Sequence, residues 1–431
     1  MSIIFIAIAM IAFAPAGWRQ VHWVPARDAV SPMEGLSRAM VESASGSVEL
    51  ALGLVGVMTL FLGLMKVAEA GGMLTVIARL IRPLMVRLFP NVPPDHPAMG
   101  SMILNMSANA LGLGNAATPF GIRAMQELDS LNPRKGTATD SMVLFLAINT
   151  SNVTLLPTGV IALRAAAGSV DPAGILPTTL FATVCSTLAA ILGARAYGRL
   201  SMFRRSRPPE VEMTEDEGSG SEKDAPGHET QTAYPVWISC MGACALIALI
   251  PLTIFFGRAI SPWIIPGLML GFLLFGVVRR VRIYEVFVEG AKEGFQVAVK
   301  IIPYLVAILV AVGMFRASGA MEAMVSAIGG LTSQVGMPAE ALPMALLRPL
   351  SGSGAYGVLA SIINDPGTGP DSYVGYLVST LQGSTETTFY VLAVYFGAVQ
   401  VRRIRHALIA ALTADLVGIA AAVAVCSYLF G

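Results

Sequence analysis

Apolar segments long enough to cross a membrane recur along the whole chain and alternate with short polar stretches. A helix that crosses the hydrocarbon core of a bilayer needs about 20 apolar residues. The pattern therefore predicts an all-α, polytopic membrane protein. The apolar runs are residues 48–64, 175–192, 236–256, 263–278, 297–315, 373–399 and 407–429.

Composition and charge agree with this environment. Charged residues make up 13% of the chain and hydrophobic residues 55%, whereas a soluble domain carries about 25% charged residues. The net charge is +1 and no basic stripe is present, so we expect a lipid bilayer and no nucleic acid as partner. Residues 1–17 have the length of a signal peptide but lack a positively charged start. We interpret them as an uncleaved first span.

A polar segment divides the chain into two halves. Residues 203–232 are rich in charged residues, Pro, Gly and Ser and nearly free of large apolar side chains, a composition that cannot bury a core. The sequence therefore predicts three parts. They are a membrane half at 1–200, a disordered cytoplasmic linker at 201–233 and a second membrane half at 234–431.

The two halves contain similar segments in the same order, which predicts an internal duplication. Both halves carry the pattern Asp-Ser-x-Val, which begins at Asp140 and at Asp371. Placing the arginine clusters on the cytoplasmic side gives the two halves opposite orientations, the inverted-repeat arrangement of many transporters. The paired segments are residues 63–73 with 313–321, 96–119 with 342–357, and 140–157 with 371–390.

One glycine motif has the spacing of a dinucleotide-binding loop, Gly352-x-Gly354-x-x-Gly357. Such a loop needs a preceding strand in a soluble βαβ unit, and no such pattern precedes Ser351. The sequence also shows no Ser/His/Asp set, no metal-ligand spacing and no phosphate loop. We therefore expect no enzyme activity, no catalytic residues, no cofactor and no bound metal.

Four polar, glycine-containing stretches interrupt the apolar runs. Within hydrocarbon, a broken helix persists only where protein or a water-filled cavity surrounds it. We therefore predict a re-entrant hairpin and a broken helix in each half, which together enclose a solute site near the membrane midplane. The alternative is that these small and hydroxyl residues only pack helices together. The candidate solute-binding residues are Asn105, Ser107, Asn109, Asn115, Asn149, Ser151, Asn152, Thr154, Ser351, Ser353, Gln382, Ser384, Thr385, Glu386 and Thr387.

Glu386 is the acidic residue that stands out most, because it lies within the apolar run 373–399. A carboxyl group at that depth needs protonation, a bound cation or a basic partner such as Arg348. In a continuous helix, Gln382 would share a face with Glu386 and could grip the same ligand. We interpret Arg348 itself as a residue that either reaches the interface or holds a hairpin tip.

Other ionisable residues at segment ends have simpler interpretations. Asp140 and Asp371 begin helical segments, where N-capping is a sufficient explanation. His96 and His406 lie beside proline or arginine at predicted interfaces, so we expect both rings to be solvated.

At the same residues the chain resembles a known group of proteins. The sequences NMSANALGLGNAATPFG and DSMVLFLAINTSNVTLLPTGVIALR are similar to the spore maturation protein A family. RPLSGSGAYG and GSTETTFYVLAVYFGAV are similar to the spore maturation protein B family. The resemblance implies a fusion of the two, each with a nucleoside recognition (Gate) domain. Related domains occur in concentrative nucleoside transporters and in ferrous iron transporters, but the P-loop of the latter's G domain is absent from this chain.

Three functions remain open at this stage. The first is a permease in the bacterial cytoplasmic (inner) membrane for a small polar, nucleoside-like solute, with H⁺ or Na⁺ as coupling ion. The second is a membrane scaffold, without transport, in envelope or spore maturation. The third is the handling of lipid or cell-wall precursors. The sequence leaves open whether the protein forms a homo-oligomer.

Overall fold

The computed structural model describes residues 2–24, 30–112, 114–151, 154–200, 265–320, 332–365 and 367–431, with isolated positions between these ranges from 235 to 263 and from 323 to 330. In this part of the chain nearly all regular structure is helical, as predicted, and one isolated β-bridge joins Thr137 to Arg403. The first half contains α1 (Ser2–Val21), α2 (Pro32–Ala70), α3 (Met73–Leu88), α4 (Pro97–Ala110), α5 (Gly114–Ser130), α6 (Asp140–Ser151), α7 (Thr158–Ala166) and α8 (Leu176–Arg199). The second contains a helix at Ile265–Val278, α11 (Ile283–Ala317), η1 (Ser333–Val335), η2 (Ala339–Ala341), α13 (Leu342–Leu347), α14 (Gly352–Ile363), α15 (Tyr373–Ser384), α16 (Thr388–Ala398) and α17 (Ala407–Phe430).

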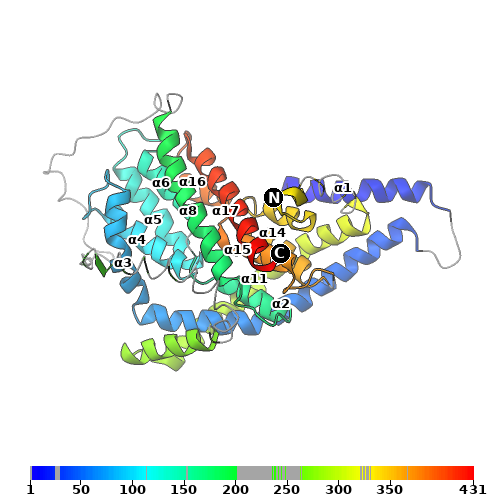
Figure 1. The fold of residues 1–431 in the computed structure, drawn as a ribbon, viewed down its shortest axis with the longest axis horizontal. Coiled ribbons are helices and arrows are strands. Elements are labelled where there is room, and N and C mark those ends of the chain that lie inside the picture. The colour runs from blue at the N-terminus through cyan, green and yellow to red at the C-terminus, as the bar shows by residue number, and fades with distance from the viewer. Residues whose placement is uncertain are drawn as a thin grey trace.

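The long helices α2 and α11 pack along each other more extensively than any other described helix pair (Figure 1). Two glycines of α11 explain the close approach. A Cβ atom at Gly290 would lie 2.7 Å from the carbonyl oxygen of Leu62, and one at Gly294 would lie 2.8 Å from that of Met58. This four-residue spacing of glycines is typical of helices that pack tightly within membranes.

Helices α8 and α17 form the second extensive pair, at the centre of the molecule (Figure 1). Each has 24 residues and is long and apolar enough to cross a membrane. A bent pair, Met58–Ala70 with Met73–Leu88, could form a further span with a bend of 69°. The turn between them contains Gly72 with φ of 83°, a left-handed conformation that glycine adopts without steric cost.

The predicted broken helices and hairpins are present in both halves. Helices α6 and α15 have 12 residues each, and each ends at a polar break before a shorter helix, α7 or α16, begins. In the first half, α4 and α5 form a hairpin with a turn at Leu111 and Gly112. In the second half, α13 and α14 occupy the corresponding position. The equivalent order of elements supports the duplication.

Some sequence predictions fall outside the described residues. The linker 201–233 and most of the run 236–256 belong to this group. The inverted orientation of the two halves stays a prediction.

Candidate functional site

The two helix breaks lie against each other, and each is closed by the tip of a hairpin. The backbone N–H of Glu386, in the second break, donates to the carbonyl of Thr150 at the end of α6, with a distance of 2.8 Å. Leu155 in the first break donates to Ala110 of the first hairpin at 2.9 Å, and Phe389 donates to Pro349 of the second at 3.1 Å. Segments from four parts of the chain therefore satisfy one another's backbone groups, as non-helical backbone inside a membrane requires.

Asparagine side chains connect the first hairpin to the helix breaks. The Asn109 amide donates to the side-chain oxygen of Asn149 at 3.0 Å. Asn105 is fully buried and donates both to the Ala117 carbonyl at 2.8 Å and to the hydroxyl oxygen of Tyr395 at 3.1 Å. Three of the predicted residues therefore belong to one polar network, which Tyr395 of α16 links to the second half.

Arg348 holds the second hairpin against the second break. It lies after α13, is only 6% exposed, and donates to the Thr385 carbonyl and to the Thr387 hydroxyl, the latter at 3.1 Å. Its guanidinium is 3.8 Å from the Glu386 carboxylate. The sequence analysis requires protonation, a bound cation or a basic partner for Glu386, and the structure places the basic partner, Arg348, beside it. Arg348 holds a hairpin tip, and the alternative that it reaches the interface is wrong.

The predicted helix face shared by Gln382 and Glu386 is wrong. Helix α15 ends at Ser384, and Thr385 has extended backbone angles, φ −137° and ψ 165°. Because the helix ends before Glu386, the four-residue spacing no longer places Glu386 on the helix face of Gln382. The Gln382 side chain is buried, whereas 38% of the Glu386 side chain is exposed.

The remaining candidates occupy several environments. Asn152 and the side chain of Asn115 lie outside the described residues. Ser107 bonds the carbonyl of Ile103 in its own helix, which fits the helix-packing alternative for this residue. Ser151 is buried and donates to Thr187 of α8 at 3.2 Å, and Thr154 is buried beside it in the first break. In the second hairpin, Ser351 caps α14 by accepting from Gly354 N–H at 3.0 Å, and Ser353 is half-buried. The buried Ser384 closes the last turn of α15.

The sequence reasoning missed Asp415, an acid in the middle of α17. It is 3% exposed, and one carboxylate oxygen, Oδ2, accepts from the Thr388 hydroxyl at 2.7 Å. Its other oxygen, Oδ1, has no hydrogen-bond partner. Asp415 lines a narrow recess with Arg348, Ser384 and Thr385. The signal that identified Glu386, an acid within an apolar run, also applies to Asp415.

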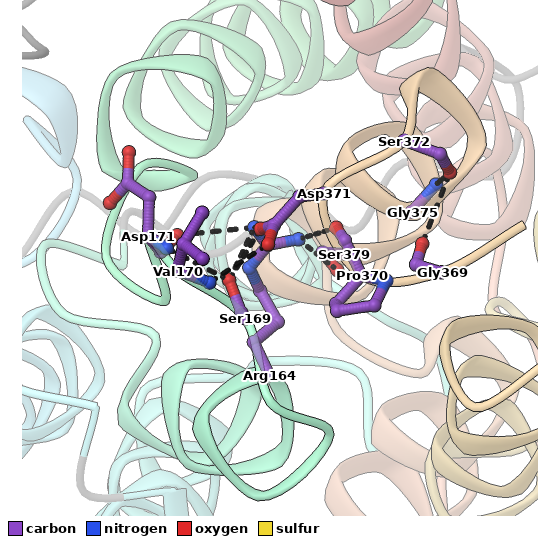
Figure 2. A network of polar contacts seen from close by, with 10 residues as sticks. All are labelled: Arg164, Ser169, Val170, Asp171, Gly369, Pro370, Asp371, Ser372, Gly375 and Ser379. Carbon is purple, nitrogen blue, oxygen red and sulfur yellow. Dashed lines mark hydrogen bonds and ion pairs between the residues drawn. The ribbon is translucent and has the colours of Figure 1, made fainter.

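A second buried arginine, also missed, joins the two halves at another point (Figure 2). Arg164, in the last turn of α7, is fully buried and lies 3.0 Å from the Asp371 carboxylate of the second half. It also donates to the carbonyls of Pro370 and Asp171, at 2.5 and 3.1 Å, and stacks over the Tyr376 ring. Ser169 and the Val170 N–H bind the same carboxylate.

The reciprocal contact occurs at the start of α6. Arg405, which follows α16 in the second half, lies 2.6 Å from the Asp140 carboxylate of the first half. Each half therefore supplies an arginine to the aspartate that opens the other half's broken helix. Such reciprocity is the property of an interface with twofold symmetry. We call these two contacts the reciprocal ion pairs.

The reciprocal ion pairs correct the expectation that Asp140 and Asp371 are helix caps. The caps are their neighbours, because Thr139 accepts from Met142 N–H at 3.2 Å and Ser372 accepts from Gly375 N–H at 3.0 Å. His406 is also not solvated. It is 1% exposed, because it packs against the end of α8 beside Arg405.

Comparisons with known proteins agree with this architecture. A family model described as nucleoside recognition (Gate) matches residues 51–167 and 298–402, just over half of the chain. Two proteins of Bacillus subtilis (strain 168) are similar to separate parts of it. Spore maturation protein B is 47% identical over 167 residues, which are 39% of this chain and 93% of that protein. Spore maturation protein A is 44% identical over 160 residues, 37% of this chain and 82% of that protein.

One solved structure also matches along nearly the whole chain. The YdaH transporter of Alcanivorax borkumensis is 14% identical, with 99% of this chain and 97% of that chain covered and a TM-score of 0.38.

Proposed function

The chain belongs to the Gate, or nucleoside recognition, family and joins a part similar to spore maturation protein A to a part similar to spore maturation protein B; from this premise we propose that it is a membrane permease for a small polar solute. The solute is nucleoside-like in its chemistry, and its movement is coupled to a proton or another cation. The protein acts in the bacterial inner membrane.

The observation that carries the proposal is the contact between the two helix breaks, through Glu386 N–H and the Thr150 carbonyl. Helix ends inside the protein present partial charges, positive at the starts of α7 and α16 and negative at the ends of α6 and α15. Paired broken helices of this kind form the solute sites of many secondary transporters. A scaffold has no need to bury so many polar groups, because each loses its hydrogen bonds to water.

The polar side chains at this contact indicate the kind of solute. Asn109, Asn149, Gln382 and Thr387 offer neutral donors and acceptors, which suit a solute that carries hydroxyl and amide-like groups and no net charge. In the conformation described, the asparagines bind each other. We expect the solute to replace these contacts when a hairpin moves away from its break.

The experiment has two stages. An untargeted metabolite comparison between a deletion strain and its parent should identify solutes whose distribution changes. Uptake of those solutes into proteoliposomes should then fall about five- to thirtyfold in Asn149→Ala, because one hydrogen bond to a polar solute is worth on the order of 1–2 kcal/mol. Ser107→Ala is the control, because that hydroxyl bonds within its own helix. Unchanged metabolites, or no uptake by the parent protein, would reject the permease, and equal uptake by the two variants would reject Asn149 as a solute contact.

The alternative is a scaffold in envelope or spore maturation. The names of the two Bacillus subtilis proteins and the close packing of the polar groups favour it. If the protein is a scaffold, Asn149→Ala should correct the defect of the deletion strain as fully as the parent sequence does, at equal protein levels in the membrane. If the protein is a permease, Asn149→Ala should not correct this defect.

A further inference from the structure

Two carboxylates lie near one buried guanidinium beside the second break. The guanidinium of Arg348 lies 3.8 Å from the Glu386 carboxylate, and Arg348 lines a narrow recess together with Asp415. With both acids ionised, this cluster carries one net negative charge within the protein. Burying uncompensated charge is costly, so the binding of one proton would neutralise the cluster.

The two acids differ in their ability to hold that proton. The Glu386 side chain is 38% exposed and has Arg348 as a basic partner. Asp415 is 3% exposed, and its Oδ1 atom is buried without a hydrogen-bond partner. Burial disfavours the ionised form of an acid, whereas a donated hydrogen bond and a nearby cation favour it. Asp415 experiences both effects, through burial on one side and Thr388 with Arg348 on the other.

No further charged group of the packed helices faces Asp415 among the described contacts. Helix α8 contributes Ser186, which bonds the neighbouring Ala414 carbonyl at 2.9 Å, and α15 contributes Ser384. Helix α6 carries its acid, Asp140, at its first residue, where Arg405 binds it. The charge of the cluster therefore depends on Asp415, Arg348 and Glu386.

A metal cation fits this place less well than a proton. The described residues contain no group of three or more His, Cys, Asp or Glu side chains that could hold a metal ion. Hard cations need about six oxygen ligands. The recess offers Asp415 and the hydroxyls of Ser384 and Thr385, beside a guanidinium that repels cations.

We infer that Asp415 is the proton-binding residue of the permease and that its protonation decides which carboxylate Arg348 binds. This inference rests on the proposed function for the solute that the proton accompanies. With Asp415 protonated, Arg348 binds Glu386, Thr385 and Thr387 and holds the second hairpin against its break. When Asp415 releases its proton to water, its carboxylate attracts Arg348 and weakens the hold on the hairpin.

The test measures the protonated carboxyl group directly. Infrared difference spectra of the purified protein in lipid, recorded between about pH 5 and pH 9, should show the C=O band of a buried carboxylic acid that disappears as the pH rises. Asp415→Asn should remove this band. Glu386→Gln leaves Arg348 without its other carboxylate partner, so the band should remain but disappear at lower pH than in the parent protein. A titrating band that persists in Asp415→Asn, or no titrating band in the parent protein, would overturn the inference.

A second variant covers the case in which Asp415→Asn does not fold. Thr388→Val removes the hydroxyl that stabilises the ionised carboxylate, so the titration should move by about one pH unit or more to higher pH. An unmoved titration would contradict the assignment. These spectra need no solute, so they decide the role of Asp415 even if proteoliposomes move none. Failure of uptake in the parent protein would instead reject the proposed function.

Discussion

At the scale of single residues, His406 lies where the end of α8 meets the start of α17. Burial, followed by the charge of the neighbouring Arg405, lowers the pKa of this imidazole below its ordinary value of 6.5. The folded protein therefore holds the ring neutral at a pH where the unfolded chain already protonates it. The stability that this provides is present above about pH 6.5 and is lost as the pH falls below it, because protons then favour the unfolded state.

We predict that replacing His406 reduces the acid sensitivity of the protein. In His406→Gln, the thermal unfolding midpoint in detergent should fall less between about pH 7.5 and pH 5 than in the parent protein. His96, whose pKa burial also lowers, should account for part of the remaining slope. An equal slope in His406→Gln would show that the histidine does not sense pH.

Single residues were also where sequence reasoning was least reliable. Asp140 and Asp371 were correctly placed at helix starts, but their partners are more than 200 positions away in the chain, at Arg405 and Arg164. A sequence pattern at a helix start carries information about contacts within that helix, so it indicated that the two aspartates cap their own helices. The partner of Glu386, Arg348, is 38 positions away, and the sequence analysis names it as a possible basic partner.

At the scale of elements, the break between α6 and α7 and the tip of the first hairpin form one structural unit. Gly112 has φ of 76°, and a Cβ atom there would overlap the Leu156 carbonyl in the break. Backbone cannot move aside as a flexible side chain can. The fit between hairpin and break therefore depends on the absence of a side chain at this position.

Gly112→Ala tests this dependence, and the chain offers a matched control. Gly136 has a similar φ of 78°, but a Cβ atom added there would have no other atom within 4 Å. Both variants incur the cost of placing an alanine in the left-handed backbone conformation. The free energy of unfolding of Gly112→Ala should fall by roughly a further 1–3 kcal/mol, the range for overpacking a tight contact. Chemical or thermal unfolding of the two purified variants would measure the difference. Equal stabilities would mean that the hairpin tip adapts without cost.

The breaks themselves could be predicted from sequence because polar, glycine-containing stretches cannot continue a lipid-facing helix. Their internal geometry could not. Whether Glu386 continues the helix of Gln382 depends on where α15 ends, and the ends of helices respond to tertiary contacts such as Arg348 with the Thr385 carbonyl. Helix periodicity therefore predicted a shared face that the break removes.

At the scale of the whole molecule, the duplication and the all-helical architecture were predicted, whereas the contacts that join the halves were not. The reciprocal ion pairs bury both arginines, with 0% of the Arg164 and 1% of the Arg405 side chain exposed. Removing one partner of a buried pair costs about 3–5 kcal/mol, because the remaining charge stays buried. The interface between halves should therefore depend on these two aspartates.

We predict that the halves 1–200 and 234–431 co-purify when expressed as two chains. Asp140→Ala or Asp371→Ala should weaken their association, and the two changes together should abolish it. Asp365→Ala is the control, because its partner Arg316 lies in the same half. Quantitative affinity purification of tagged halves would measure the effect. Full association of the double variant would show that helix packing alone holds the halves together.

The reciprocal ion pairs also bear on gene dosage. A half made without its counterpart carries a buried arginine whose counter-charge belongs to the missing part, and a membrane offers it no replacement. Where the two parts are separate proteins, a cell has to match their rates of synthesis or remove the surplus by proteolysis. A single reading frame produces one of each with every round of translation, so the stoichiometry is set before the chain reaches the membrane.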